Sequence, residues 1–259
     1  MLLAQTRSMV KQRRVSIERA ISRPTLESGS RPLPKSATGL NHDDVRITDF
    51  KQLHKIGEGS YSNVKLFQRD GVLYAVKVFR KPMNSQILDN VRSEIEVLRR
   101  LNHGNIVKLH YTFEDTNHLY IVLEYIDGKT LAAFLKKPLA EEQLKSISRQ
   151  LLAAVGCMHS NNIAHRDLKL DNIMIDEATN RVVIIDFGFA TACEKKLKMF
   201  CGTPSYMSPE IVKRGWYSGS KADIWALGVI LYRMATGVFP FRGGTELEVF
   251  GKICKSKYD

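Results

Sequence analysis

The sequence predicts an α+β protein, with a small antiparallel β-rich part at residues 47–126 and a larger, mainly helical part at residues 127–259. The first observation is a strand pattern at residues 72–79, which alternates with a period of two and follows the hairpin turn Asp70-Gly71. The second is an apolar stripe at three- and four-residue steps, typical of one face of a helix: Leu144, Ile147, Leu151, Val155 and Met158.

The positive charge of the chain is concentrated near its N-terminus. The protein has 259 residues and a formal net charge of +12, from 39 Lys and Arg against 27 Asp and Glu. Residues 1–40 hold eight basic and two acidic side chains, a local charge of +6. Because this stretch is rich in Ser, Pro and Gly, we expect residues 1–46 to be a disordered basic tail without catalytic residues. The remaining charge is spread along the chain, so no nucleic-acid partner is needed to explain it.

Two other interpretations of the tail stay open. Ser16 follows Arg13 and Arg14, a pattern typical of basophilic phosphorylation sites, although a solvated tail explains the same residues. Residues 1–17 contain no acidic residue and carry Arg, Lys and Ser, a composition that mitochondrial presequences share.

The sequence also indicates where in the cell the protein is located and in which redox state its cysteines are. The longest apolar run, residues 226–232, is too short to cross a bilayer and suits a buried helix. We expect a soluble protein with reduced thiols and no zinc site, located inside the cell in the cytoplasm or nucleus. Two observations lead to this expectation: the four cysteines show no CxxC spacing, and no signal peptide precedes them. The cysteines are Cys157, Cys193, Cys201 and Cys254.

A glycine-rich turn opens the β-rich part. Gly57 and Gly59 stand between two strand-like segments and precede Val64. Glycines at such a turn let backbone N–H groups approach phosphate oxygens closely. Taken alone, the pattern also fits an ordinary hairpin. The segment that follows is a strand, which excludes the helix that a dinucleotide-binding fold requires there.

Two charged residues interrupt apolar patterns in neighbouring elements. Lys77 shares a strand face with Leu73, Ala75 and Phe79, and Glu94 is the lone charge in the helical stripe of residues 86–101. Buried charges are rare unless they are paired. We therefore expect an ion pair between Lys77 and Glu94, while two snorkelling side chains at the core edge remain the alternative.

Four further motifs make the sequence resemble a eukaryotic protein kinase over residues 47–259. They are Ala75-Val76-Lys77, His165-Arg166-Asp167-Leu168-Lys169-Leu170-Asp171-Asn172, Asp186-Phe187-Gly188 and Ser208-Pro209-Glu210. Lys169 and Gly202-Thr203-Pro204 resemble the serine/threonine-specific branch. The overall texture is similar to the calcium/calmodulin-dependent and AMP-activated relatives.

The resemblance implies a kinase fold of two lobes, with ATP in the cleft between them and its γ-phosphoryl group transferred to Ser or Thr hydroxyls of protein substrates. Lys77, held by Glu94, would bind the α- and β-phosphates. Asp167 would orient the acceptor hydroxyl and take its proton, and Lys169 would stabilise the transferred charge. Asn172 and Asp186 would hold Mg²⁺, a cation that prefers oxygen ligands.

The resemblance also implies the residues that contact the nucleotide. Glu124 and Ile126 would meet the adenine edge through backbone groups, with Leu123 as gatekeeper. The complete set is Ile56, Gly57, Gly59, Ser60, Val64, Ala75, Lys77, Leu123, Glu124, Ile126 and Met174.

Three departures from the family pattern matter. Met199 occupies the place of the activating phosphothreonine, so we expect activity that does not depend on phosphorylation there. Thr130 replaces the acid that contacts ribose, which should weaken nucleotide binding modestly. The chain ends at Asp259, before the family's last helices and the arginine that pairs with Glu210, so we expect a costly unpaired buried carboxylate and an exposed apolar flank.

Two explanations of the short C-terminal end remain open at this point. The chain is a piece of a working kinase, or it is a catalytically impaired binding or scaffold module. A small-molecule kinase of related fold is disfavoured, because residues 202–210 resemble a segment that docks peptides. The five residues most often needed for catalysis are all present: Lys77, Glu94, Asp167, Asn172 and Asp186.

Overall fold

The structure is a computed structural model that describes residues 45–58, 62–193 and 196–258. The expected disordered tail, apart from its last two residues, lies outside the described residues. So do Gly59 and Ser60 of the glycine-rich turn. Below, the N-terminal lobe means residues 47–126 and the C-terminal lobe means residues 127–258.

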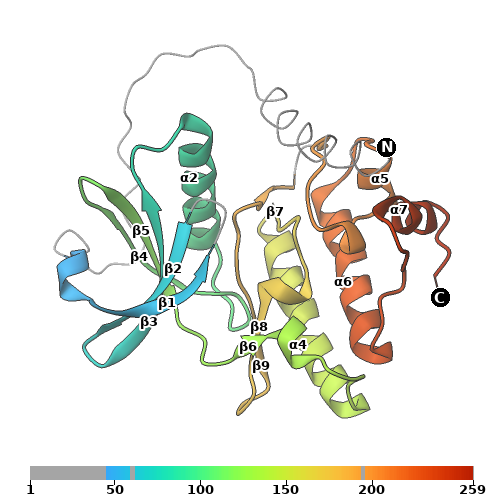
Figure 1. The fold of residues 1–259 in the computed structure, drawn as a ribbon, viewed down its shortest axis with the longest axis horizontal. Helices are drawn as coiled ribbons and strands as arrows, with labels where there is room; N and C mark the ends of the chain where they lie inside the picture. Colours follow the sequence, from blue (N-terminus) through green and yellow to red (C-terminus); the bar gives the residue numbers. More distant parts are fainter. Residues whose placement is uncertain (1–44, 59–61, 194–195, 259) are drawn as a thin grey trace. The chain divides into compact units, whose positions relative to one another are not determined.

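The N-terminal lobe is built on a five-stranded sheet in the order β1-β2-β3-β5-β4, with every neighbouring pair antiparallel. A 3-10 turn, η2 (Ile47–Asp49), precedes it, and helix α2 (Ser85–Arg100) connects β3 to β4 (Figure 1). The predicted small antiparallel sheet with one helix is therefore confirmed. The strands are β1 (Lys51–Glu58), β2 (Ser62–Arg69), β3 (Val72–Arg80), β4 (Leu109–Glu114) and β5 (His118–Glu124).

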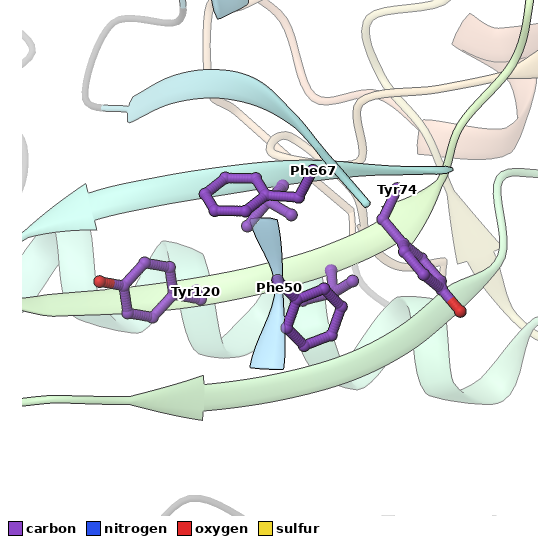
Figure 2. Close-up of a cluster of buried hydrophobic side chains, with 6 residues drawn as sticks. Phe50, Phe67, Tyr74 and Tyr120 are labelled. Atoms are coloured by element: carbon purple, nitrogen blue, oxygen red, sulfur yellow. The ribbon is translucent and has the colours of Figure 1, made fainter. Parts of the chain in front are cut away.

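The sheet of the N-terminal lobe has two apolar faces, whereas the alternation in residues 72–79 predicts only the face that carries Lys77. Strand pairing places Tyr74, Val76 and their partners on the face opposite Lys77. That opposite face carries a buried cluster, in which Phe50 contacts Tyr74 edge to face at 5.6 Å between ring centroids (Figure 2). The cluster consists of Phe50, Phe67, Tyr74, Val76, Tyr120 and Val122. The aromatic cluster and Lys77 therefore lie on opposite faces of the sheet.

The C-terminal lobe is mainly helical, as predicted, and carries two small sheets of order β6-β8-β9 and β10-β7 (Figure 1). Its helices are α3 (Leu131–Phe134), α4 (Glu141–Ser160), α5 (Pro209–Val212), α6 (Gly219–Thr236) and α7 (Glu246–Cys254), with 3-10 turns η3 (Leu170–Asn172) and η4 (Pro204–Tyr206). Its strands are β6 (Lys129–Thr130), β7 (Ile163–Ala164), β8 (Ile173–Asp176), β9 (Arg181–Ile184) and β10 (Thr191–Ala192).

Helices α4 and α6 form the apolar centre of this lobe. The predicted stripe lies on α4, where four of its five residues are buried and Leu144 is half-buried. The run at residues 226–232 lies inside α6 and is largely buried. Among the described residues, no helix combines the length and the apolar character that a membrane crossing would need.

Strand β9 is hydrogen-bonded to the segment that precedes β4. The amide of Val107 donates to the carbonyl of Ile184 at 3.0 Å, and the amide of Ile184 donates to the carbonyl of Asn105 at 2.9 Å. Arg181 adds an ion pair of 2.7 Å with Glu124 at the end of β5. These contacts fix the start of the segment that carries Asp186 against the N-terminal lobe.

Candidate active site

Lys77 on β3 lies between two carboxylates from different elements. Its Nζ is 2.6 Å from Oε1 of Glu94 on α2 and 2.9 Å from Oδ1 of Asp186, which follows β9. The side chains of Lys77 and Glu94 are only 12% and 5% exposed. The ion pair that the two pattern breaks predicted is therefore present, and it extends to a third residue from the C-terminal lobe.

The opposite charges of Lys77 and its two carboxylate neighbours favour the ionised form of Lys77 and of Asp186. Burial alone would lower the pKa of the Lys77 ammonium, but the carboxylates of Glu94 and Asp186 outweigh burial and raise it above its ordinary value. Burial acts to raise the pKa of Asp186, yet the charge and the hydrogen bond of Lys77 hold it below its usual range. Both groups are consequently ionised at neutral pH, so the ammonium can bind an anion and the carboxylate can bind a cation.

Asp167 is the centre of a second network, on the loop between β7 and β8. Its Oδ2 accepts from Nζ of Lys169 at 2.8 Å and from Nδ2 of Asn172 at 3.2 Å. Its Oδ1 accepts from Oγ1 of Thr203 at 3.1 Å, and Lys169 also donates to this hydroxyl at 3.2 Å. The carboxylate is 7% exposed and thus fixed from three sides. The resemblance marks Thr203 as part of the serine/threonine-specific branch pattern and of the segment 202–210, and neither predicts its bond to Asp167.

Asn172 and Asp186 come together through the backbone. The amide of Ile185 donates to the carbonyl of Asn172 at 2.9 Å, which places the residue before Asp186 directly beside Asn172. Asn172 donates through its amide nitrogen to Asp167, so its side-chain carbonyl oxygen is the atom suited to a cation. A carboxylate and an amide oxygen are hard ligands, and the Asp186 side chain is 45% exposed. The pair fits Mg²⁺ held jointly with phosphate oxygens.

Asp223 on α6 holds the loop that carries Asp167. Its Oδ2 accepts from the amide of His165 at 2.8 Å and lies 3.0 Å from Nε2 of His159, while its Oδ1 accepts from the amide of Arg166 at 2.8 Å. Arg166 has a φ of +67°, a left-handed conformation that a non-glycine residue adopts only at a cost. Asp223 is 1% exposed and compensates that cost by satisfying both amides.

The residues expected to contact adenine share one face of the sheet. In β2, β3 and β5 the strand register puts Val64 opposite Lys77 and Ala75 opposite Leu123, all on the Lys77 side. Gly57 pairs with Val64, and a Cβ at position 57 would meet only ordinary contacts, so the protein's own packing does not require glycine there. The structure thus brings together part of the predicted set on one surface.

The other predicted nucleotide contacts are more scattered. Ile56 is 41% exposed on β1, Ile126 is buried after β5, and Met174 is half-buried on β8. The side chain of Glu124 is engaged by Arg181, which leaves the backbone as its means of contact with a ligand. The remaining two, Gly59 and Ser60, lie outside the described residues.

The three departures from the family pattern have distinct structural outcomes. Thr130 is the N-cap of α3, where its hydroxyl accepts from the amide of Ala133 at 3.2 Å. Met199 is 52% exposed, and its Sδ lies 3.8 Å from Nη1 of Arg166. The expectation that Glu210 is a buried, unpaired carboxylate is wrong, because Glu210 is exposed and its charge is solvated.

Ser208 has a buried hydroxyl without a hydrogen-bond partner in the part of the chain that the structure describes. It occupies the N-cap position of α5 but makes no capping bond there. Since an unsatisfied buried hydroxyl costs about 1–3 kcal/mol, we expect Ser208→Ala to stabilise the protein by about 1 kcal/mol. The urea midpoint of unfolding measures this, and Ser85→Ala on the exposed first turn of α2 is the control. A lower midpoint for Ser208→Ala would contradict the prediction.

Comparison with known proteins places this geometry in a family. The sequence matches the protein kinase domain family over residues 50–258. It is 39% identical over 218 residues to "Putative sperm motility kinase W" of Mus musculus, covering 82% of this chain and 43% of that protein. It is 34% identical over 226 residues to maternal embryonic leucine zipper kinase of Xenopus tropicalis, covering 84% of this chain and 34% of that protein.

A third relative is NUAK family SNF1-like kinase 2 of Homo sapiens, 34% identical over 250 residues that cover 93% of this chain and 40% of that protein. The chain spans less than half the length of these curated relatives. The latter two are serine/threonine kinases related to the AMP-activated enzymes within the calcium/calmodulin-dependent group, the branch that the sequence resembles. On its motifs, its fold and the match over residues 50–258, the chain belongs to the protein kinase domain family.

Proposed function

We propose that this chain transfers the γ-phosphoryl group of ATP to serine and threonine hydroxyls of protein substrates. One observation carries the proposal: the Asp167 carboxylate is fixed by Lys169, Thr203 and Asn172. A carboxylate held in this way can orient an acceptor hydroxyl and accept its proton. The family match supports the same activity.

Lys77, Glu94 and Asp186 supply the electrostatic part of the mechanism. Phosphoryl transfer passes through a loose transition state, so catalysis depends on positioning and on neutralising charge on phosphate oxygens. Lys77 binds the α- and β-phosphates, and Glu94 keeps its ammonium in place. Because Asp186 shares Lys77, nucleotide entry replaces part of an existing ion pair with phosphate contacts.

Asn172 and Asp186 hold the cation in this proposal. Bound Mg²⁺ would supply positive charge at the phosphate oxygens, which lowers the energy of the transferring group. Lys169 lies 2.8 Å from Asp167 and stabilises the transferred group from the acceptor side. Thr203 belongs to the segment 202–210, which resembles a peptide-docking site. Its hydroxyl is hydrogen-bonded to both Lys169 and Asp167 and so connects them to that segment.

The nucleotide base packs on the Lys77 face of the sheet in this proposal. Val64, Ala75 and Leu123 offer an apolar surface on that face, and Met174 covers the ring from the C-terminal lobe. Gly57 leaves the backbone open to phosphate. The protein acts inside the cell, in the cytoplasm or nucleus, in keeping with its four free thiols.

The test is transfer of labelled γ-phosphate from ATP to a library of serine and threonine peptides. We expect incorporation that stops when Mg²⁺ is removed with a chelator and returns when Mg²⁺ is added back. A matched library with tyrosine as its only hydroxyl residue should stay unlabelled. Absence of label in the serine and threonine library, or equal label in the tyrosine library, would contradict the proposal.

A further inference from the structure

The side chain of Met199 is held next to a cation that has no carboxylate partner among the described residues. The Nη1 of Arg166 contacts the Sδ of Met199 at 3.8 Å, while its Nε donates to the carbonyl of Phe189 at 2.6 Å. No ion pair joins Arg166 to an acidic side chain within residues 45–58, 62–193 and 196–258. The Tyr217 hydroxyl is a further hydrogen-bond partner of the Arg166 side chain. A thioether is a weak acceptor by comparison, so Met199 is a poorer partner for Nη1 than an oxygen acceptor would be.

The backbone around Met199 is fixed, although its side chain is exposed. Leu197 forms a two-way backbone bridge with Tyr217, at 2.8 and 2.9 Å. The Tyr217 hydroxyl donates to the carbonyl of Met199 at 3.0 Å. Phe200 packs against a buried cluster that includes Met207 and Ile211. The sulfur is therefore presented to solvent and to Arg166 at a defined place.

Met199 is the only exposed methionine within the described ranges. Its exposed fraction is 52%, whereas the others are half-buried (Met83 and Met174) or buried (Met158, Met207 and Met234). Oxidation of methionine follows access to the sulfur. An oxidant in solution thus reaches Met199 more readily than the other described methionines.

We propose that Met199 is an oxidation site, at which hydroperoxides convert the thioether to a sulfoxide whose oxygen accepts a hydrogen bond from Arg166. The Sδ lone pair attacks a peroxide oxygen, an S–O bond forms, and the O–O bond breaks. With hydrogen peroxide, the departing hydroxide takes the proton of the transferred oxygen and leaves as water. The thioether loses two electrons and the peroxide gains them.

The sulfoxide changes the contact in a definite direction. A polar S–O group replaces a weak acceptor by a strong one beside a full positive charge. Methionine is flexible enough for the added oxygen to turn towards Nη1 without movement of the backbone. The new bond ties the segment around Met199 to Arg166, the residue next to Asp167. This consequence for activity rests on the proposed kinase function.

The test compares the protein before and after treatment with hydrogen peroxide, followed by dithiothreitol to reverse reducible cysteine oxidation. Among the methionines that the structure describes, peptide mass mapping should locate an added oxygen at Met199 first. We expect the melting temperature to rise by about 2–4 °C, the shift that one net hydrogen bond gives in a domain of this size, and the rate of peptide phosphorylation to change with it. Methionine sulfoxide reductases should reverse all three changes.

Two substitutions provide the matched controls. Met199→Leu keeps the volume but cannot be oxidised, so peroxide should shift neither its melting temperature nor its rate. Met199→Gln places a carbonyl acceptor near Arg166 and should reproduce the oxidised values without peroxide. An unchanged melting temperature after full conversion of Met199, or an equal response in Met199→Leu, would overturn the inference. If the protein transfers no phosphate in either state, the proposed function fails, while the melting temperature still decides the oxidation site.

Discussion

Asp167→Asn is expected to lower the rate of phosphate transfer by about 10²- to 10⁴-fold, the usual contribution of a positioned general base. The amide cannot take the proton of an acceptor hydroxyl. Its NH₂ group would also face donors, because Lys169 and Asn172 both donate to the carboxylate. The measurement is the steady-state rate of labelled phosphate transfer to serine and threonine peptides.

The affinity for ATP separates this effect from a general loss of structure. Asp167 is not among the residues proposed to contact the nucleotide, so Asp167→Asn should bind ATP with nearly the affinity of the unmodified protein. Asp176→Asn is the matched control, since Asp176 caps a turn after β8 and lies away from this network. Its rate should be unchanged. Transfer by Asp167→Asn at the original rate would remove Asp167 from the mechanism.

The sequence contains enough information to predict the ion pair in the N-terminal lobe. Lys77 breaks the apolar alternation of β3, and Glu94 breaks the apolar stripe of α2. A buried charge needs a partner, so two local faults in neighbouring elements point to each other. The small antiparallel sheet and the helical stripe on α4 could also be predicted, because each depends on periodicity within a short segment.

Features that depend on distant contacts were not predictable in this way. Thr203 reaches Asp167 across 36 residues, and Asp223 reaches His165 across 58. No periodicity links such positions. The sequence indicates only that Thr130 replaces an acid, whereas in the structure its hydroxyl caps α3. The expectation for Glu210 failed because its exposure depends on which elements surround it, and one residue's identity does not determine that.

Asp223→Ala is expected to destabilise the protein by about 3–5 kcal/mol, the usual cost of breaking a buried charged group's hydrogen-bond network. The substitution leaves the amides of His165 and Arg166 without their acceptor inside the lobe. The measurement is the free energy of unfolding in urea. Lys221→Gln, at an exposed position on the same helix, should change that free energy by no more than about 0.5 kcal/mol.

Asp223→Asn separates the loss of a charge from the loss of an acceptor. An asparagine keeps one oxygen but turns an NH₂ group towards a backbone N–H, so we expect an intermediate destabilisation of about 1–3 kcal/mol. Because Asp223 also offsets the left-handed backbone of Arg166, the residue before Asp167, the variant should transfer phosphate more slowly per folded molecule as well. Reduced stability with an unchanged rate per folded molecule would show that Asp223 supports the lobe without positioning Asp167.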